Sequence, residues 1–89
     1  MAELSEKAPR YGRMLSDAVE SVKVIDDSEE AEDFLELARS YLEDGEHFLE
    51  DGDEVNALAA FSYGHAWLDA GVRVGFFEME EGEEGLFAA

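Results

Sequence analysis

The chain has 89 residues, of which 24 are acidic and only 6 are Lys or Arg, so its formal net charge is −18 at pH 7. So negative a chain is a poor match for nucleic acid, whose phosphates select basic surfaces, and the absence of cysteine excludes disulfides, thiol catalysis and thiolate zinc sites. At this length we expect one small domain whose hydrophobic core is only just sufficient.

The first predicted helix covers residues 10–25. Apolar side chains recur there at intervals of three and four residues, which is the pattern of an amphipathic helix. Pro9 is expected to lie near its start, because proline is unfavourable inside a helix, and residues 1–9 are expected to be loosely ordered. The predicted buried positions are Tyr11, Leu15, Ala18, Val22 and Ile25.

The second predicted helix covers residues 28–51. Asp27 or Ser28 is placed to accept the first backbone N–H groups of this helix, and Glu30 can complete a capping box behind Asp27. Acidic residues line one side, and apolar residues recur on the other at threes and fours. The predicted buried positions are Ala31, Phe34, Leu35, Ala38, Tyr41, Leu42, Gly45, Phe48 and Leu49.

A tight turn at residues 51–53 is predicted to join this helix to a third one, over residues 53–76. Gly52 is expected to adopt the left-handed conformation that ends the second helix, and Asp53 is expected to cap the third. The second and third helices should therefore form an antiparallel hairpin.

The third helix is the most apolar segment of the chain. Ala57, Gly64 and Gly71 recur every seven residues and form a smooth face on which another backbone can approach closely. Because a glycine inside a helix costs roughly 1 kcal/mol relative to alanine, Gly64 and Gly71 predict close packing that compensates. Gly75 is expected to mark a frayed or capped end.

The third helix also carries more apolar surface than two companion helices can cover. We therefore expect a protein partner or a homodimer, and the alternative is a monomer in which the first helix covers this surface completely. The predicted contact residues are Tyr63, Trp67, Val74 and Phe77, with Tyr11 and Tyr41 at the rim.

One polar row lies along the third helix, at Ser62, His65, Asp69 and Arg73. His65 and Asp69 are one helical turn apart and can supply two metal ligands. A third would have to come from the second helix, from His47, Glu43, Glu46 or Glu50. The alternative is a structural role, in which Asp69 pairs with Arg73 and His65. Ser62, His65 and Asp69 on one helix offer no oxyanion hole, so we predict neither catalysis nor a cofactor.

Composition indicates a folded protein with an acidic surface, because hydrophobic residues make up 46% of the chain. Many carboxylates and few lysines are typical of proteins from a cytosol of multimolar salt, where screening removes most self-repulsion. The alternative is a nucleic-acid mimic that binds a basic partner, which the spread of acidic residues along the chain disfavours. No apolar run approaches the ~20 residues of a membrane span, and residues 1–10 lack a signal-peptide core, so we expect a cytoplasmic protein.

Residues 78–89 are predicted to be a mobile acidic tail, because this segment loses helical periodicity and carries five glutamates and two glycines. An alternative role for Leu86 and Phe87 is docking onto a partner.

Two resemblances accompany these patterns. The first is a local resemblance to a single tetratricopeptide hairpin, which is a protein-interaction scaffold. It rests on the spacing of Tyr41, Gly45, Phe48, Gly52, Ala57, Phe61 and Gly64. The chain holds no second copy of this unit, so the likeness is local.

The second resemblance is more specific and covers roughly residues 10–77. The chain resembles the archaeal family called domain of unknown function 357 at Tyr63, at residues 67–71 and at residues 75–77. Relative to the pattern expected for that family, Gly64 and Ala66 are exchanged. The resemblance implies an archaeal source and an all-α fold, an up-and-down three-helix bundle. It implies no activity.

These observations predict an interaction or scaffold module. The rival hypothesis is a protein that binds a metal or small ligand through His65 and Asp69. A third hypothesis is a regulatory subunit whose acidic tail contacts a basic partner.

Overall fold

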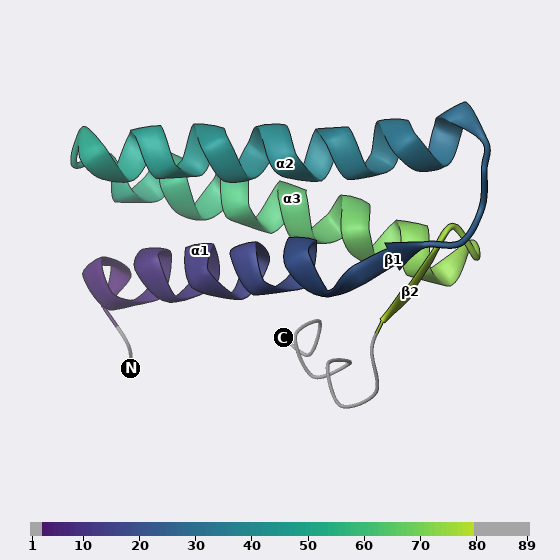
Figure 1. Cartoon of the computed structure of the whole chain (residues 1–89). Coiled ribbons are helices and arrows are strands. Elements are labelled where there is room, and N and C mark those ends of the chain that lie inside the picture. Colours follow the sequence, from purple (N-terminus) through teal and green to yellow (C-terminus); the bar gives the residue numbers. More distant parts are fainter. Residues whose placement is uncertain (1–2, 80–89) are drawn as a thin grey trace.

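The computed structural model describes residues 3–79 and confirms the all-α, up-and-down three-helix bundle. The elements are α1 (Leu4–Ser21), β1 (Val22–Val24), α2 (Glu29–Glu50), α3 (Glu54–Arg73) and β2 (Phe77–Met79). Figure 1 shows that α1 and α3 run in one direction and α2 runs in the opposite direction, with a small two-stranded ribbon where α1 ends.

The helix α1 begins at Leu4, six residues before the predicted start, and contains Pro9. Proline removes one backbone hydrogen bond there. The turn ahead of it nevertheless packs on the core, because Ala8 is fully buried and Leu4 is half-buried on the same side. The apolar stripe therefore continues through the proline, and the segment up to residue 9 is helical from Leu4 rather than loosely ordered.

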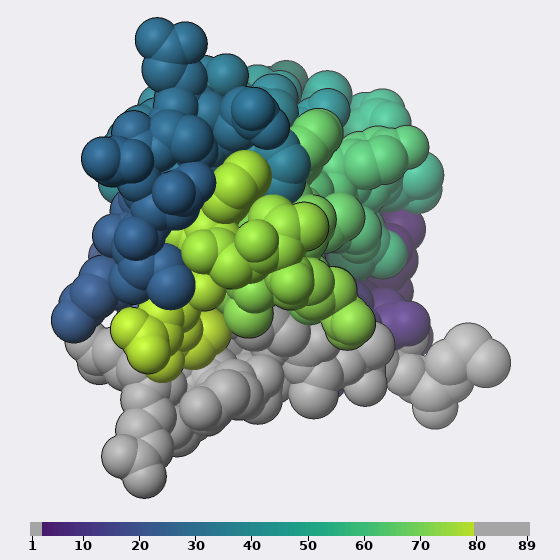
Figure 2. Space-filling model, turned by 90° about the vertical axis from the view of Figure 1, so that its right-hand side faces the viewer, coloured from purple at the N-terminus to yellow at the C-terminus, as the bar shows by residue number. Residues whose placement is uncertain are grey.

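At its other end α1 stops at Ser21, four residues earlier than predicted, because the next three residues form β1. This strand pairs antiparallel with β2, and Lys23 lies opposite Glu78. Figure 2 views this end of the bundle and shows the chain around β2 packed against the blue segment that leads into α2. The first two residues of the predicted mobile tail, 78 and 79, therefore belong to a strand, and residues 80–89 lie outside the described residues. Ile25, predicted to be buried, is 55% exposed.

The helix α2 is capped by Ser28. Its side chain accepts a hydrogen bond from the backbone N–H of Ala31 at 3.2 Å and donates one to Asp26 at 2.6 Å. Of the two predicted caps, Ser28 is confirmed, and the capping box of Asp27 and Glu30 is wrong. With Ser28 as the cap, the third helical residue is Ala31, whose methyl group cannot accept a hydrogen bond and so cannot complete a box.

The turn between α2 and α3 is as predicted. Gly52 has φ of 78°, and Asp53 accepts a hydrogen bond from the backbone N–H of Asn56 at 3.1 Å. The N–H of Asp53 reaches back to the carbonyl of Phe48 at 2.8 Å, which satisfies one of the last acceptors of α2.

The same closing motif ends α3, which stops at Arg73 rather than at residue 76. Gly75 has φ of 88°, and the N–H of Phe76 donates to the carbonyl of Gly71 at 2.8 Å. Gly75 is therefore a helix cap that turns the chain towards β2.

Replacing Gly75 by alanine is expected to lower the free energy of unfolding by about 1–2 kcal/mol. No atom would obstruct the new methyl group, so the cost comes from the left-handed backbone alone. Chemical denaturation of Gly75→Ala tests this expectation. Gly75→Asn is the control, because asparagine tolerates this conformation and should lose less stability.

The core of the bundle is organised around Phe61, which is completely buried on α3. Its ring fills the space above Gly12 of α1 and Gly45 of α2, and a Cβ atom added at either glycine would overlap it. One aromatic ring therefore joins all three helices, and two glycines in the neighbouring helices make room for it.

The glycines of α3 confirm the predicted close packing. A Cβ atom at Gly64 would lie 2.5 Å from Leu15 and 3.3 Å from the backbone oxygen of Ala38, and one at Gly71 would overlap the ring of Phe77. Gly64 thus allows α1 and α2 to approach α3, and Gly71 receives the first residue of β2.

Candidate functional site

Most side chains of the polar row on α3 form hydrogen bonds within α3 itself. Ser62 donates its hydroxyl hydrogen to the carbonyl of Leu58 at 2.9 Å, so this hydroxyl serves its own helix. The Nε of Arg73 donates to both carboxylate oxygens of Asp69, at 3.0 and 3.1 Å. The predicted Asp69–Arg73 pair is therefore confirmed, and it lies at the surface, where 42% of the Asp69 side chain is exposed.

His65 lies on the side of α3 that faces α1 and is partly buried. Burial lowers the pKa of His65 below its ordinary value of 6.5, and a hydrogen bond with the backbone of Tyr11 opposes this shift. The imidazole therefore belongs to the α1–α3 contact and favours its neutral form in the folded protein.

This pKa shift predicts a pH-dependent stability with a definite sign. The unfolded chain takes up a proton near pH 6.5 and the folded chain only at lower pH. The stability that neutral His65 contributes is fully present above pH 6.5 and is lost as the pH falls from there through the folded-state pKa. Unfolding of the native chain and of His65→Gln at pH 5–8 should differ most at the upper end of this range. Parallel curves would show that His65 does not titrate differently on folding.

A metal centre at His65 and Asp69 is not assembled. Asp69 is engaged by Arg73, while His47 lies exposed on α2 with Glu43 and Glu50 at 3.9 Å from its ring nitrogens. In the part of the chain that the structure describes, no three His, Asp or Glu side chains come together as metal ligands. The fold thus leaves His65, Asp69 and His47 as separate residues.

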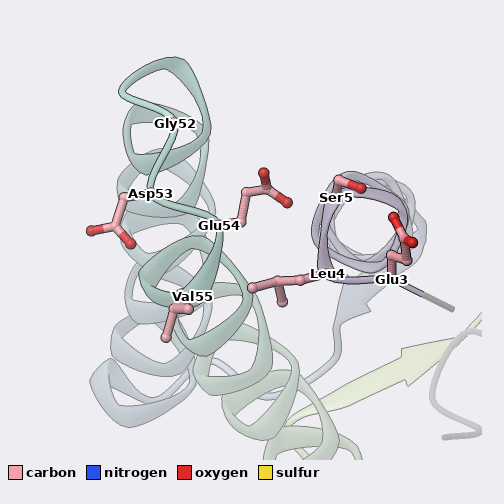
Figure 3. Close-up of a pocket in the computed structure, with 7 residues that line it drawn as sticks. All are labelled: Glu3, Leu4, Ser5, Gly52, Asp53, Glu54 and Val55. Carbon is pink, nitrogen blue, oxygen red and sulfur yellow. The ribbon is translucent and has the colours of Figure 1, made fainter.

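An open depression lies at the end of the bundle where α1 and α3 begin (Figure 3). The lining includes the carboxylates of Glu3, Asp53 and Glu54. The Asp53 carboxylate already binds the backbone and the side chain of Asn56. Carboxylates at the first turns of helices are stabilised by the helix dipoles, so these acids are explained as helix-end residues.

The predicted aromatic surface is divided by the fold. Phe77 is only 2% exposed and packs over Gly71, so it belongs to the core and is wrong as a contact residue. Trp67 is half-buried, and its ring meets that of Phe34 edge-on at 4.9 Å. Phe34 in turn contacts Phe76 at 5.0 Å. These rings hold α2 against the end of α3.

The side of α3 that faces solvent remains uncovered by residues 3–79. Val55, Tyr63 and Val74 are 66%, 61% and 60% exposed, and Ala59 and Ala66 between them are also exposed. We call these five residues the α3 face. Tyr63 leans on Tyr41 of α2, with ring centroids 5.5 Å apart. Two of the predicted contact residues, Tyr63 and Val74, lie on this face.

The other three members of the α3 face, Val55, Ala59 and Ala66, were not among the predicted contact residues. A signal for them exists in the sequence, because residues 55–68 contain no Asp, Glu, Lys or Arg. By contrast, α2 carries nine acidic residues and one arginine. The longest stretch of the sequence without a charged residue therefore lies on α3, next to a strongly acidic α2.

Comparison with known proteins gives one family and one solved structure. Residues 10–77 match the model of the family described as protein of unknown function, DUF357. A crystal structure of a protein from Archaeoglobus fulgidus, assigned to the same family, superposes with a TM-score of 0.74 at 25% sequence identity. The match covers 85% of this chain and 92% of that one. No curated protein matches the chain. Among the helices of residues 3–79, none has the length and apolar character of a membrane span.

Proposed function

The chain belongs to the DUF357 family, whose description assigns no activity, and we propose that it is a non-catalytic protein-interaction module that binds its partner through the α3 face. The observation that carries this proposal is the contrast in charge. A chain of net charge −18 leaves one exposed helix surface free of charged side chains over fourteen residues, 55–68.

The composition of this face favours contact with protein. Exposed apolar residues scattered singly are ordinary, but Val55, Ala59, Tyr63 and Ala66 follow one another along a single helix surface, and Val74 lies beyond the exposed Asp69–Arg73 pair. Tyrosine is enriched at protein interfaces because its ring is large and its hydroxyl tolerates water. Small alanines beside it allow a second backbone to approach.

The setting we propose is a cytosol of concentrated salt. Only one ion pair involves a Lys or Arg within residues 3–79, Asp69–Arg73, so little in that range offsets the repulsion among carboxylates. Concentrated salt both screens this repulsion and strengthens apolar association, and therefore favours binding through the α3 face.

Site-specific photo-cross-linking tests the proposed function. A photoactivatable residue is placed at Ala59 on the α3 face or, as the matched control, at exposed Ser40 on α2. Each protein is irradiated in cytosolic extract of the source cells in concentrated potassium chloride. We expect discrete adducts from position 59 and few from position 40.

A second substitution shows whether such adducts depend on this face. Ala66→Glu adds a charge at an exposed helical position and should preserve helicity while removing the adducts from position 59. The proposal would be overturned if position 59 gave no adducts, or if both positions gave the same ones.

A further inference from the structure

We propose that the partner of the α3 face is a second copy of this chain, packed antiparallel across a two-fold axis that passes close to Tyr63. This inference rests on the proposed function and adds the identity and orientation of the partner. A symmetric dimer is the commonest closed assembly of a soluble protein, and its contact surface must be complementary to itself.

Charge restricts how two copies can meet. Each copy carries −18, so most relative orientations bring carboxylates together. The outward side of α2 is the extreme case, with nine acidic residues against one arginine. Contact through residues 55–68 of both copies places no charged side chain in the centre of the interface, whereas contact through α1 would bring Lys7, Arg10 and Arg13 of the two copies together.

The order of residues along α3 matches antiparallel pairing. When the two-fold axis passes between Tyr63 and Gly64, residues whose numbers add to about 127 lie opposite each other. Ala59 then faces Ala66 of the second copy. Val55 meets Val74 at each end of the contact, so two small residues face each other near the centre and two larger apolar residues close the edges.

Arg73 lies at one end of the α3 face, and its side chain is exposed. Antiparallel pairing places the two Arg73 side chains at opposite ends of the contact, whereas parallel pairing would place them against each other. Charge therefore favours the antiparallel arrangement.

The proposed contact is small. A helix of 20 residues is about 30 Å long, and a surface one helix wide lies at the small end of specific protein interfaces. Association should therefore be concentration-dependent, and it should strengthen with salt.

Sedimentation equilibrium of the purified full chain tests the dimer. In concentrated potassium chloride the average mass should rise from 9.9 kDa towards twice that value as the chain approaches millimolar concentration. Ala66→Glu should stay at the monomer mass with unchanged circular dichroism. The control Ser40→Glu, on α2, should associate like the native chain. A native mass of 9.9 kDa at every concentration would overturn the proposal.

Cysteine pairing tests the orientation, because the native chain contains no cysteine. On oxidation, a mixture of Ala59→Cys and Ala66→Cys chains should form a disulfide-linked dimer. Ala59→Cys alone should not form such a dimer, because the two copies of residue 59 would lie about 13 Å apart along the helix axis, beyond the reach of a disulfide. Efficient linkage of Ala59→Cys to itself would contradict the antiparallel arrangement.

These outcomes separate this inference from the proposed function. A monomer that still gives position-59 adducts in extract retains an interaction face but has a different partner. The absence of both association and adducts removes both proposals.

Discussion

Phe61→Ala is expected to lower the free energy of unfolding by about 3–5 kcal/mol, which is a large share of the stability of a small domain. The ring is fully buried and contacts α1 at Gly12 and α2 at Gly45, so its removal leaves a cavity among all three helices. Urea denaturation followed by circular dichroism measures this loss. A loss below about 1 kcal/mol would show that the ring does not hold the helices together.

A double-mutant cycle tests the contact between Phe61 and Gly45 directly. In the native background Gly45→Ala should destabilise by about 1–3 kcal/mol, because the new methyl group overlaps the ring. In a Phe61→Leu background the same change should cost much less or stabilise, because alanine favours helix and the ring is gone. Equal costs in both backgrounds would contradict the packing described here.

The second large effect expected is salt-dependent folding. The helix α2 places acidic residues one turn apart, for example Glu32 with Glu36 and Glu46 with Glu50, and each such pair destabilises a helix by about 0.2–0.5 kcal/mol when unscreened. Helicity should therefore fall when the chain is dialysed from multimolar into millimolar potassium chloride.

Removing part of the negative charge of α2 provides the control for this salt effect. A variant with Glu32→Gln, Glu36→Gln and Glu46→Gln keeps the exposed surface polar and should need less salt to reach full helicity. If the native chain had the same circular dichroism at both salt concentrations, its acidic surface would not be an adaptation to concentrated salt.

Local chemistry explains which parts of the fold were predictable. The turn through Gly52 and Asp53 depends on residues adjacent in sequence, and its predicted geometry is confirmed. The spacing of Gly64 and Gly71 likewise marks a close contact without revealing what fills it. In the structure these partners are Leu15 and Phe77, which are distant in sequence.

The errors arise where distant segments decide the outcome. Proline at position 9 indicates a helix start, but burial of Ala8 keeps the preceding turn helical. The strands β1 and β2 have three residues each, too few for an alternating pattern to stand out, and each exists because the other pairs with it. Pairing also carries Phe77 into the core, which explains why it was wrongly predicted to be exposed.

The α3 face was also predictable only in part from the sequence. The excess of apolar surface on α3 indicated an interaction, and Tyr63 and Val74 lie where a partner can reach them. Helical periodicity alone does not tell which apolar side the neighbouring helices cover, so Trp67 was placed with them although it packs against Phe34. The charge-free stretch 55–68 shows that the exposed side of α3 lacks charge there, but it covers every side of the helix and does not identify the exposed one.

The measurement that tests the α3 face most directly is residue-by-residue NMR of the isotope-labelled chain in concentrated potassium chloride, alone and with source-cell extract. We expect the backbone amide signals of Val55, Ala59, Tyr63 and Ala66 to shift or broaden as the concentration of extract or of the chain rises, while the signal of Ser40 on α2 stays unchanged. Changes confined to the acidic side of α2, or no change on α3 under either condition, would contradict this expectation.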